Sequence, residues 1–168
     1  MLKRIVNIFL ILIVGIPVMG QTEIKNKSYA NRLKFLLSHN VEEISVKDAV
    51  AISDKVVFLD SREKSEYNIS HIKDAQWVGY DDFDIKRLKT ISKDSKIIIY
   101  CSVGYRSEKI TSKLNKLGYK NVSNLYGGIF EWVNQGNKVY SNDGEVTLKV
   151  HTYNKRWGRW LNRGVKVY

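Results

Sequence analysis

Short apolar runs alternate along the chain with segments in which apolar residues recur at helical spacing. The clearest run is the isoleucine triplet at 97–99, which Tyr100 follows. An unbroken run of this kind is typical of a central strand that is buried on both faces. Beyond a short loop, residues 110–117 carry apolar side chains on one helical face, and Gly118 stands where a capping glycine belongs. The stretch 96–117 is therefore predicted to be a strand, a loop and a helix.

The same alternation runs through the rest of the chain. Further strands are predicted at 41–44, 55–59, 75–78 and 122–125, and further helices at 45–52, 63–68, 85–91 and 129–135. Arg62 and Glu66 have the i, i+4 spacing of a side-chain pair on a helix. A leading helix begins near Ser28, its expected N-cap. Alternating strands and helices predict an α/β fold with a mostly parallel central sheet and helices on both faces.

Cys101, the single cysteine, lies at the carboxyl end of the predicted central strand, where α/β sheets bind ligands. The free N–H groups and the dipole of the following helix favour an anion there, and Arg106 adds a permanent positive charge. Gly104 allows the loop a positive φ angle. The alternative is an inert buried cysteine. The combination of strand, glycine, arginine and helix favours a reactive thiolate in an exposed loop.

Residues 1–20 have the pattern of a signal peptide. Lys3 and Arg4 precede an apolar stretch, and Gly20 is the small residue before a cleavage site at Gln21. The alternative is an uncleaved anchor, although the apolar stretch is shorter than the ~20 residues that a membrane span needs. We expect export to the periplasm or cell envelope, with membrane anchoring as the alternative. A lone cysteine cannot form an internal disulfide, and in an oxidising compartment it indicates a free reactive thiol.

Four segments in order resemble the rhodanese domain family over residues 41–138. They are Asp60-Ser61-Arg62-Glu63 with Glu66-Tyr67, His71-Ile72 with Ala75, Cys101-Ser102-Val103-Gly104-Tyr105-Arg106-Ser107, and Leu125-Tyr126-Gly127-Gly128 with Trp132. Ser70 and Asp74 depart from the family pattern, which has glycine at both places. The chain then divides into a signal peptide (1–20), a helical lead-in (21–40), a rhodanese domain (41–138) and a basic, aromatic C-terminal extension (139–168).

The resemblance implies a sulfurtransferase without metal or cofactor. Cys101 would take a sulfane sulfur from a small donor such as thiosulfate, hold it as a persulfide and pass it to a thiol or cyanide. The loop that binds this sulfur would comprise Ser102, Val103, Gly104, Tyr105, Arg106 and Ser107. Arg106 would either attract the anionic donor or brace the loop. Asp60, Arg62 and His71 are expected to support neighbouring loops.

Two other functions fit a cysteine at this position. Cysteine phosphatases have five residues between cysteine and arginine, whereas four separate Cys101 from Arg106, and the sequence offers no obvious acidic residue near the loop. This disfavours a phosphatase. The second alternative is an exported module whose thiol binds sulfur or senses oxidants without turnover, and it stays open.

The C-terminal extension interleaves bases with aromatic residues between 153 and 160, after a predicted strand at 146–150. The net charge of +11 falls to +9 when Lys3 and Arg4 leave with the signal peptide. We expect the tryptophans to pack against the core while the bases face water. The alternative is that residues 149–168 dock an acidic protein or an anionic surface. Nucleic acid is not expected as a partner of an exported protein.

Overall fold

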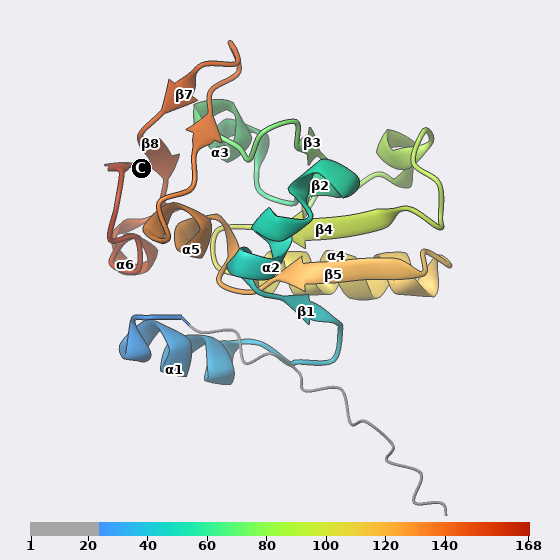
Figure 1. Cartoon of the computed structure of the whole chain (residues 1–168), viewed down its shortest axis with the longest axis horizontal. Coiled ribbons are helices and arrows are strands. Elements are labelled where there is room, and N and C mark those ends of the chain that lie inside the picture. Colours follow the sequence, from blue (N-terminus) through green and yellow to red (C-terminus); the bar gives the residue numbers. More distant parts are fainter. Residues whose placement is uncertain (1–23) are drawn as a thin grey trace, which may run out of the picture.

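A five-stranded parallel sheet forms the centre of the computed structural model, which describes residues 24–168 (Figure 1). The strand order is β1-β5-β4-β2-β3, and every neighbouring pair is parallel. The strands are β1 Glu43–Ile44, β2 Val57–Asp60, β3 Gln76–Trp77, β4 Lys96–Tyr100 and β5 Asn121–Leu125. This confirms the predicted fold class. The expected signal peptide, residues 1–20, lies outside the described residues, so its cleavage and export stay predictions.

Helices cover both faces of this sheet. In Figure 1, α4 lies behind β4 and β5, whereas α2 lies in front of them. The helices are α1 Lys27–Leu36, α2 Val46–Ala51, α3 Lys64–Ile69, α4 Tyr105–Lys116, α5 Gly128–Asn134 and α6 Lys155–Gly158, with short 3-10 helices η1 Ser53–Lys55 and η2 Ile85–Leu88. Within residues 24–168, no helix is long and apolar enough to cross a membrane.

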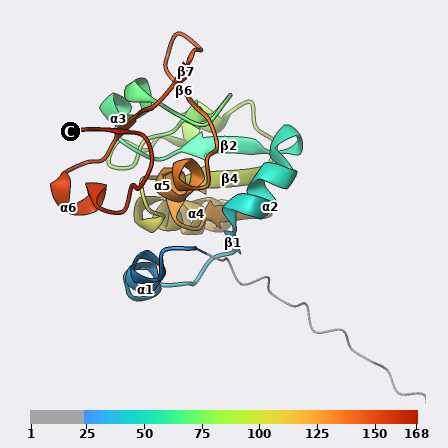
Figure 2. The ribbon, with the colours of Figure 1, turned by 60° about the vertical axis from the view of Figure 1, so that its left-hand side comes forward.

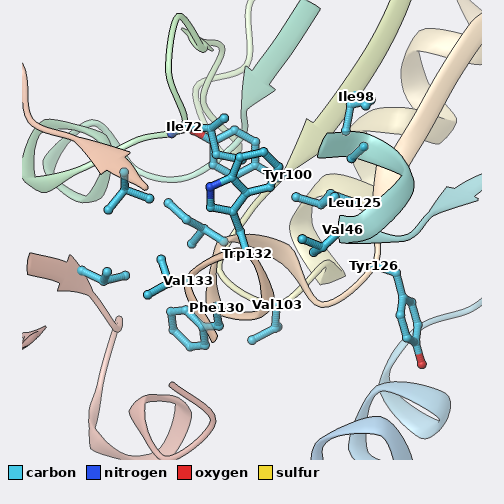
Figure 3. Close-up of a cluster of buried hydrophobic side chains, with 14 of the residues drawn as sticks. Val46, Ile72, Ile98, Tyr100, Val103, Leu125, Tyr126, Phe130, Trp132 and Val133 are labelled. Atoms are coloured by element: carbon cyan, nitrogen blue, oxygen red, sulfur yellow. Dashed lines mark hydrogen bonds between the residues drawn. The ribbon is translucent and has the colours of Figure 1, made fainter. Parts of the chain in front are cut away.

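Alternate residues of the central strands face two apolar cores. Ile98 belongs to one core, which α1, α2 and α5 help to build, whereas Ile97 and Ile99 belong to the other, with α4 and η2. Figure 3 shows the first core, to which Trp132 and Tyr100 both belong, together with Val103 of the Cys101 loop. The side chain of Val103 therefore anchors the cysteine loop in the core.

The leading helix begins earlier than the sequence predicted. Its N-cap is Asn26 rather than Ser28, because the Asn26 side chain accepts the N–H of Tyr29 at 3.1 Å. Ser28 instead lies in the first turn. The Tyr29 hydroxyl donates to the carbonyl of Gly127 at 2.8 Å, and the Glu108 carboxylate accepts the N–H of His39 at 2.8 Å. These bonds tie the lead-in segment to the domain.

The predicted single strand at 146–150 is wrong. The segment forms two strands, β7 Val146–Thr147 and β8 Lys149–His151, which separate at Leu148. Each half has its own partner: β7 pairs antiparallel with β6 Val139–Tyr140, and β8 pairs parallel with β9 Val165–Val167. The Leu148 side chain, 70% exposed, marks the junction. An alternating pattern predicts the extended backbone but not the change of partner.

Candidate active site

Cys101 follows the last residue of β4, and its loop leads directly into α4. Its Sγ accepts the N–H of Gly104 at 3.2 Å. Gly104 is the N-cap of α4 and has a φ of 110°, a conformation that strongly favours glycine. The first N–H groups of α4 have no acceptor within the helix, and the helix dipole places partial positive charge there. The predicted strand, loop and helix are confirmed, and they hold the sulfur atom beside hydrogen-bond donors.

Two polar side chains fix the backbone of Gly104. Asn124, near the end of β5, donates from Nδ2 to the Gly104 carbonyl at 3.1 Å. The Ser107 hydroxyl donates to Asn124 Oδ1 at 2.6 Å. Ser107 thus lies behind the loop, as part of its support. Asn124 was missed in the sequence, although a polar residue at the carboxyl end of a strand beside the central strand was an available signal.

Arg106 is paired with Glu66 by two hydrogen bonds, of 2.6 Å from Nη1 and 2.9 Å from Nη2. The Ser102 hydroxyl donates to the same carboxylate at 3.1 Å. Burial opposes ionisation of Glu66, but the hydrogen bonds and charge of Arg106 outweigh it and lower the Glu66 pKa. The same pairing, working against burial, raises the pKa of Arg106. Arg106 also donates to the Ser102 hydroxyl at 3.1 Å, so it is tied to the loop, and Glu66 balances its charge. Whether Arg106 braces the loop or attracts the donor stays a prediction.

Arg62 pairs with Asp60, not with Glu66. Its Nη2 donates to Asp60 at 2.6 Å and to the carbonyl of Ser70 at 2.6 Å, and both charged side chains are fully buried. The i, i+4 expectation is wrong because Arg62 precedes α3, so it does not share a helical face with Glu66. This geometry joins the end of β2 to the turn after α3, and the supporting role of Asp60 and Arg62 stays a prediction.

His71 lies apart from the cysteine, at the turn after α3. Its ring stacks on Tyr67 at 4.1 Å between centroids, and its Nδ1 lies 3.1 Å from the Tyr67 carbonyl. Its backbone forms a bridge with Tyr140. These contacts pack His71 against Tyr67 of α3 and join its backbone to Tyr140, near the start of the C-terminal extension.

A pocket of about 320 Å³ opens above the cysteine. It is lined by Glu63, Tyr80, Asp81, Cys101, Ser102, Val103, Tyr105, Arg106, Tyr153 and Trp157. Cys101 is only 1% exposed, so the expected exposed loop is instead a buried pocket floor. The side chain of Val103 packs into the core and pulls the loop inward.

Two acidic side chains, Glu63 and Asp81, lie in the pocket wall. The sequence offered no obvious aspartic acid close to the loop, whereas the structure places Asp81 in the pocket wall. Glu63 immediately precedes α3, and the turn at Asp81 follows β3, so chain folding rather than sequence proximity brings both to the cysteine. Burial raises the pKa of Glu63, in spite of the opposing charge of Arg106.

Replacing Gly128 with alanine should displace the Cys101 loop. Gly128 begins α5 with a φ of 57°, and an added Cβ would lie 2.7 Å from the carbonyl carbon of Ser102. Overpacking of this kind costs about 1–3 kcal/mol, in addition to the left-handed backbone cost. We expect urea unfolding to show a larger loss of stability for Gly128→Ala than for Gly144→Ala. Gly144 also has a positive φ, but nothing lies within 4 Å of its added Cβ, so equal losses would contradict the clash.

Comparisons with known proteins identify the central part of this chain. A family model described as "Rhodanese-like domain" matches residues 45–135, more than half of the chain. The tRNA uridine(34) hydroxylase of Hamiltonella defensa subsp. Acyrthosiphon pisum is 35% identical over 111 residues. That alignment covers 62% of this chain and 29% of the relative, so the chain spans less than a third of the relative's length.

Solved structures show the same fold. A Bacillus halodurans protein is 25% identical, with a TM-score of 0.56, and the match covers 71% of this chain and 88% of that one. A thiosulfate sulfurtransferase from Pseudomonas aeruginosa has a TM-score of 0.58 at 20% identity, over 70% of this chain and 23% of the other. The second likeness supports the fold alone.

Proposed function

Because this chain belongs to the rhodanese-like domain family, we propose that it transfers a sulfane sulfur through a persulfide on Cys101. The observation that carries the proposal is the position of the thiol. Cys101 lies on the floor of a pocket, with its Sγ 3.2 Å from the N–H of Gly104 and directly before the start of α4. This environment favours an anionic sulfur.

In the first step, the Cys101 thiolate attacks the outer sulfur of thiosulfate. A bond forms between the two sulfur atoms while the sulfur–sulfur bond of thiosulfate breaks, and its electron pair leaves with sulfite. The enzyme then holds Cys101–S–S⁻. The N–H groups of residues 102–106 stabilise this added anionic sulfur as preorganised donors.

In the second step, a nucleophile attacks the outer sulfur of the persulfide. The bond to Cys101 breaks, its electron pair returns to the cysteine as thiolate, and the acceptor leaves with the sulfur atom. Cyanide yields thiocyanate, and a thiolate yields an organic persulfide. This two-step covalent route gives ping-pong kinetics. Arg106 supports both steps by holding Ser102 and Glu66, with which it shares hydrogen bonds.

The hydroxylase activity in the name of the Hamiltonella defensa relative is not carried over to this chain. The alignment covers 29% of that protein, so the similarity supports a sulfur-transfer domain and no further activity. The Pseudomonas aeruginosa neighbour, at 20% identity, likewise does not establish thiosulfate as the donor. Thiosulfate serves here as the test donor because its outer sulfur is a sulfane sulfur.

Incubation of the chain with thiosulfate should add the mass of one sulfur atom, located on Cys101, the single cysteine. Cyanide should remove that mass and produce thiocyanate steadily over many turnovers, which mass spectrometry and a colorimetric assay would measure together. A module that only senses or stores sulfur would instead show one modification per chain and no continuing thiocyanate release. That result would contradict the proposed enzyme.

A further inference from the structure

Two of the residues that line the cysteine pocket lie outside the region that matches the family. Tyr153 and Trp157 line the pocket, yet the family match ends at residue 135. In Figure 1 the arrows of β4 and β5 point toward the side where α5 and α6 lie, so the extension reaches the carboxyl ends of the central strands. The extension is therefore part of the site and not a separate arm.

The segment that carries these aromatic residues is held by its own helix cap and by contacts with α1. The Asn154 side chain caps α6 by accepting the N–H of Trp157 at 3.1 Å. Trp160 stacks on Tyr29 of α1 with 5.4 Å between ring centroids, and Arg32 of α1 lies 5.7 Å from the Trp157 ring. Figures 1 and 2 show α6 at the same edge of the molecule as α1. The pocket wall is thus held in place before any substrate arrives.

The backbone of Tyr153 is strained. Its φ of 64° lies in the left-handed region, which is costly for a residue with a Cβ. Its side chain is 57% exposed, so burial does not explain the presence of tyrosine there. The ring contacts Arg106, whose guanidinium carbon lies 5.6 Å from the ring centroid. A strained, half-exposed aromatic residue beside the arginine of the cysteine loop points to a role in binding.

The chemistry of the pocket wall indicates which substrate it fits. Four of the lining side chains are aromatic: Tyr80, Tyr105, Tyr153 and Trp157. The charge of Arg106 is already balanced by Glu66, and Glu63 and Asp81 disfavour a carboxylate. A pocket of about 320 Å³ is far larger than cyanide needs and has room for a ring. The wall therefore suits a flat organic ring that carries no carboxylate.

We infer that Tyr153 and Trp157 select the sulfur acceptor, and that this acceptor is a thiol attached to an aromatic or heteroaromatic ring. The ring packs against the two side chains while its thiolate attacks the outer sulfur of the Cys101 persulfide. The bond to Cys101 breaks, and the ring leaves as an organic persulfide. This inference deepens the proposed sulfur transfer and rests on it.

The test compares three acceptors with the whole chain loaded from thiosulfate. Thiophenol carries a ring, 2-mercaptoethanol does not, and cyanide is too small to reach the wall. We expect Tyr153→Gly and Trp157→Ala each to lower the ratio of kcat/KM for thiophenol to kcat/KM for cyanide about five-fold, the effect of one lost aromatic contact. Comparing variants with the same acceptor cancels the acceptor's own nucleophilicity.

Asp74→Gly is the matched control. Asp74 also has a positive φ, of 57°, but lies outside the pocket, so this variant relieves strain without removing a pocket wall. Tyr153→Gly removes a half-exposed side chain, so this variant can still test the inference if Trp157→Ala fails to fold. The inference would be overturned if the variants lowered kcat/KM equally for thiophenol and 2-mercaptoethanol, or lowered it for neither acceptor. If wild type transfers sulfur to none of the three acceptors, the proposed function itself fails.

Discussion

Replacing Cys101 with serine is expected to lower the rate of sulfur transfer by roughly 10³-fold or more, as the loss of a catalytic nucleophile does in other covalent enzymes. A serine oxygen cannot form a persulfide, and no other cysteine is present to replace it. Sulfite release from thiosulfate and thiocyanate formation would both be measured. Turnover that survives in Cys101→Ser would refute the persulfide mechanism.

The same variant should retain the fold. Cys101 is buried, so serine introduces a hydroxyl into the pocket floor, but that hydroxyl can accept the N–H of Gly104 that now bonds to sulfur. We expect a loss of about 1 kcal/mol in the free energy of unfolding, the scale of one altered hydrogen bond. Alkylation of wild type provides a matched control, since the reagent has a single cysteine to modify. Alkylation of Cys101 should lower the activity of wild type to the same extent as the Cys101→Ser substitution.

The local part of the site could be predicted because it is encoded in consecutive residues. An apolar run, a cysteine, Gly104 and a helical pattern specify where the thiol lies and which backbone groups surround it. The local backbone conformation also accounts for Asp74 and Ser70, the two positions at which the sequence departs from the family pattern. Asp74 adopts a φ of 57°, where glycine is favoured, whereas Ser70 is extended and needs no glycine.

The remainder depends on contacts between distant residues. Glu66 reaches Arg106 across 40 positions, and its partner could not be deduced from helical spacing. Tyr153 and Trp157 lie in a segment where a mixture of bases and aromatic residues indicated packing against the core, with docking of a partner as the alternative. Trp157 and Trp160 are half-buried against the core, as the packing interpretation expected, but the pattern gave no sign that Trp157 also lines the pocket.

Replacing Arg106 with methionine is expected to destabilise the protein by about 3–5 kcal/mol, because it leaves a buried carboxylate without its partner. The Glu66 side chain is 1% exposed, against 15% for Arg106. Glu66→Gln should cost less, since the arginine left behind is closer to solvent and lies 3.9 Å from Glu63. Urea unfolding of both single variants and the double variant would measure the coupling between the two side chains.

The loss in the free energy of unfolding that Arg106→Met causes should become smaller as the pH falls. In wild type the folded-state pKa of Glu66 lies below its ordinary value of 4.5, so its contribution to stability is present above that pH and is lost as the pH falls through the folded-state pKa. In the variant, burial of Glu66 acts without the opposing arginine and favours the protonated form. Unfolding measured at neutral pH and near pH 4 should therefore show a smaller difference between the two proteins under acidic conditions. A difference that does not depend on pH would contradict the assignment to Glu66.

The same variants separate the two roles considered for Arg106. If Arg106 mainly recruits an anionic donor, Glu66→Gln frees its charge and should leave or raise kcat/KM for thiosulfate. If it braces the loop, both Arg106→Met and Glu66→Gln should lower the rate of persulfide formation, because each disrupts the paired contact between Arg106 and Glu66, the two side chains that hold Ser102. The paired geometry favours the second outcome. Arg106→Lys should then fail to restore the rate, since one ammonium group cannot reproduce the two-pronged contact with Glu66.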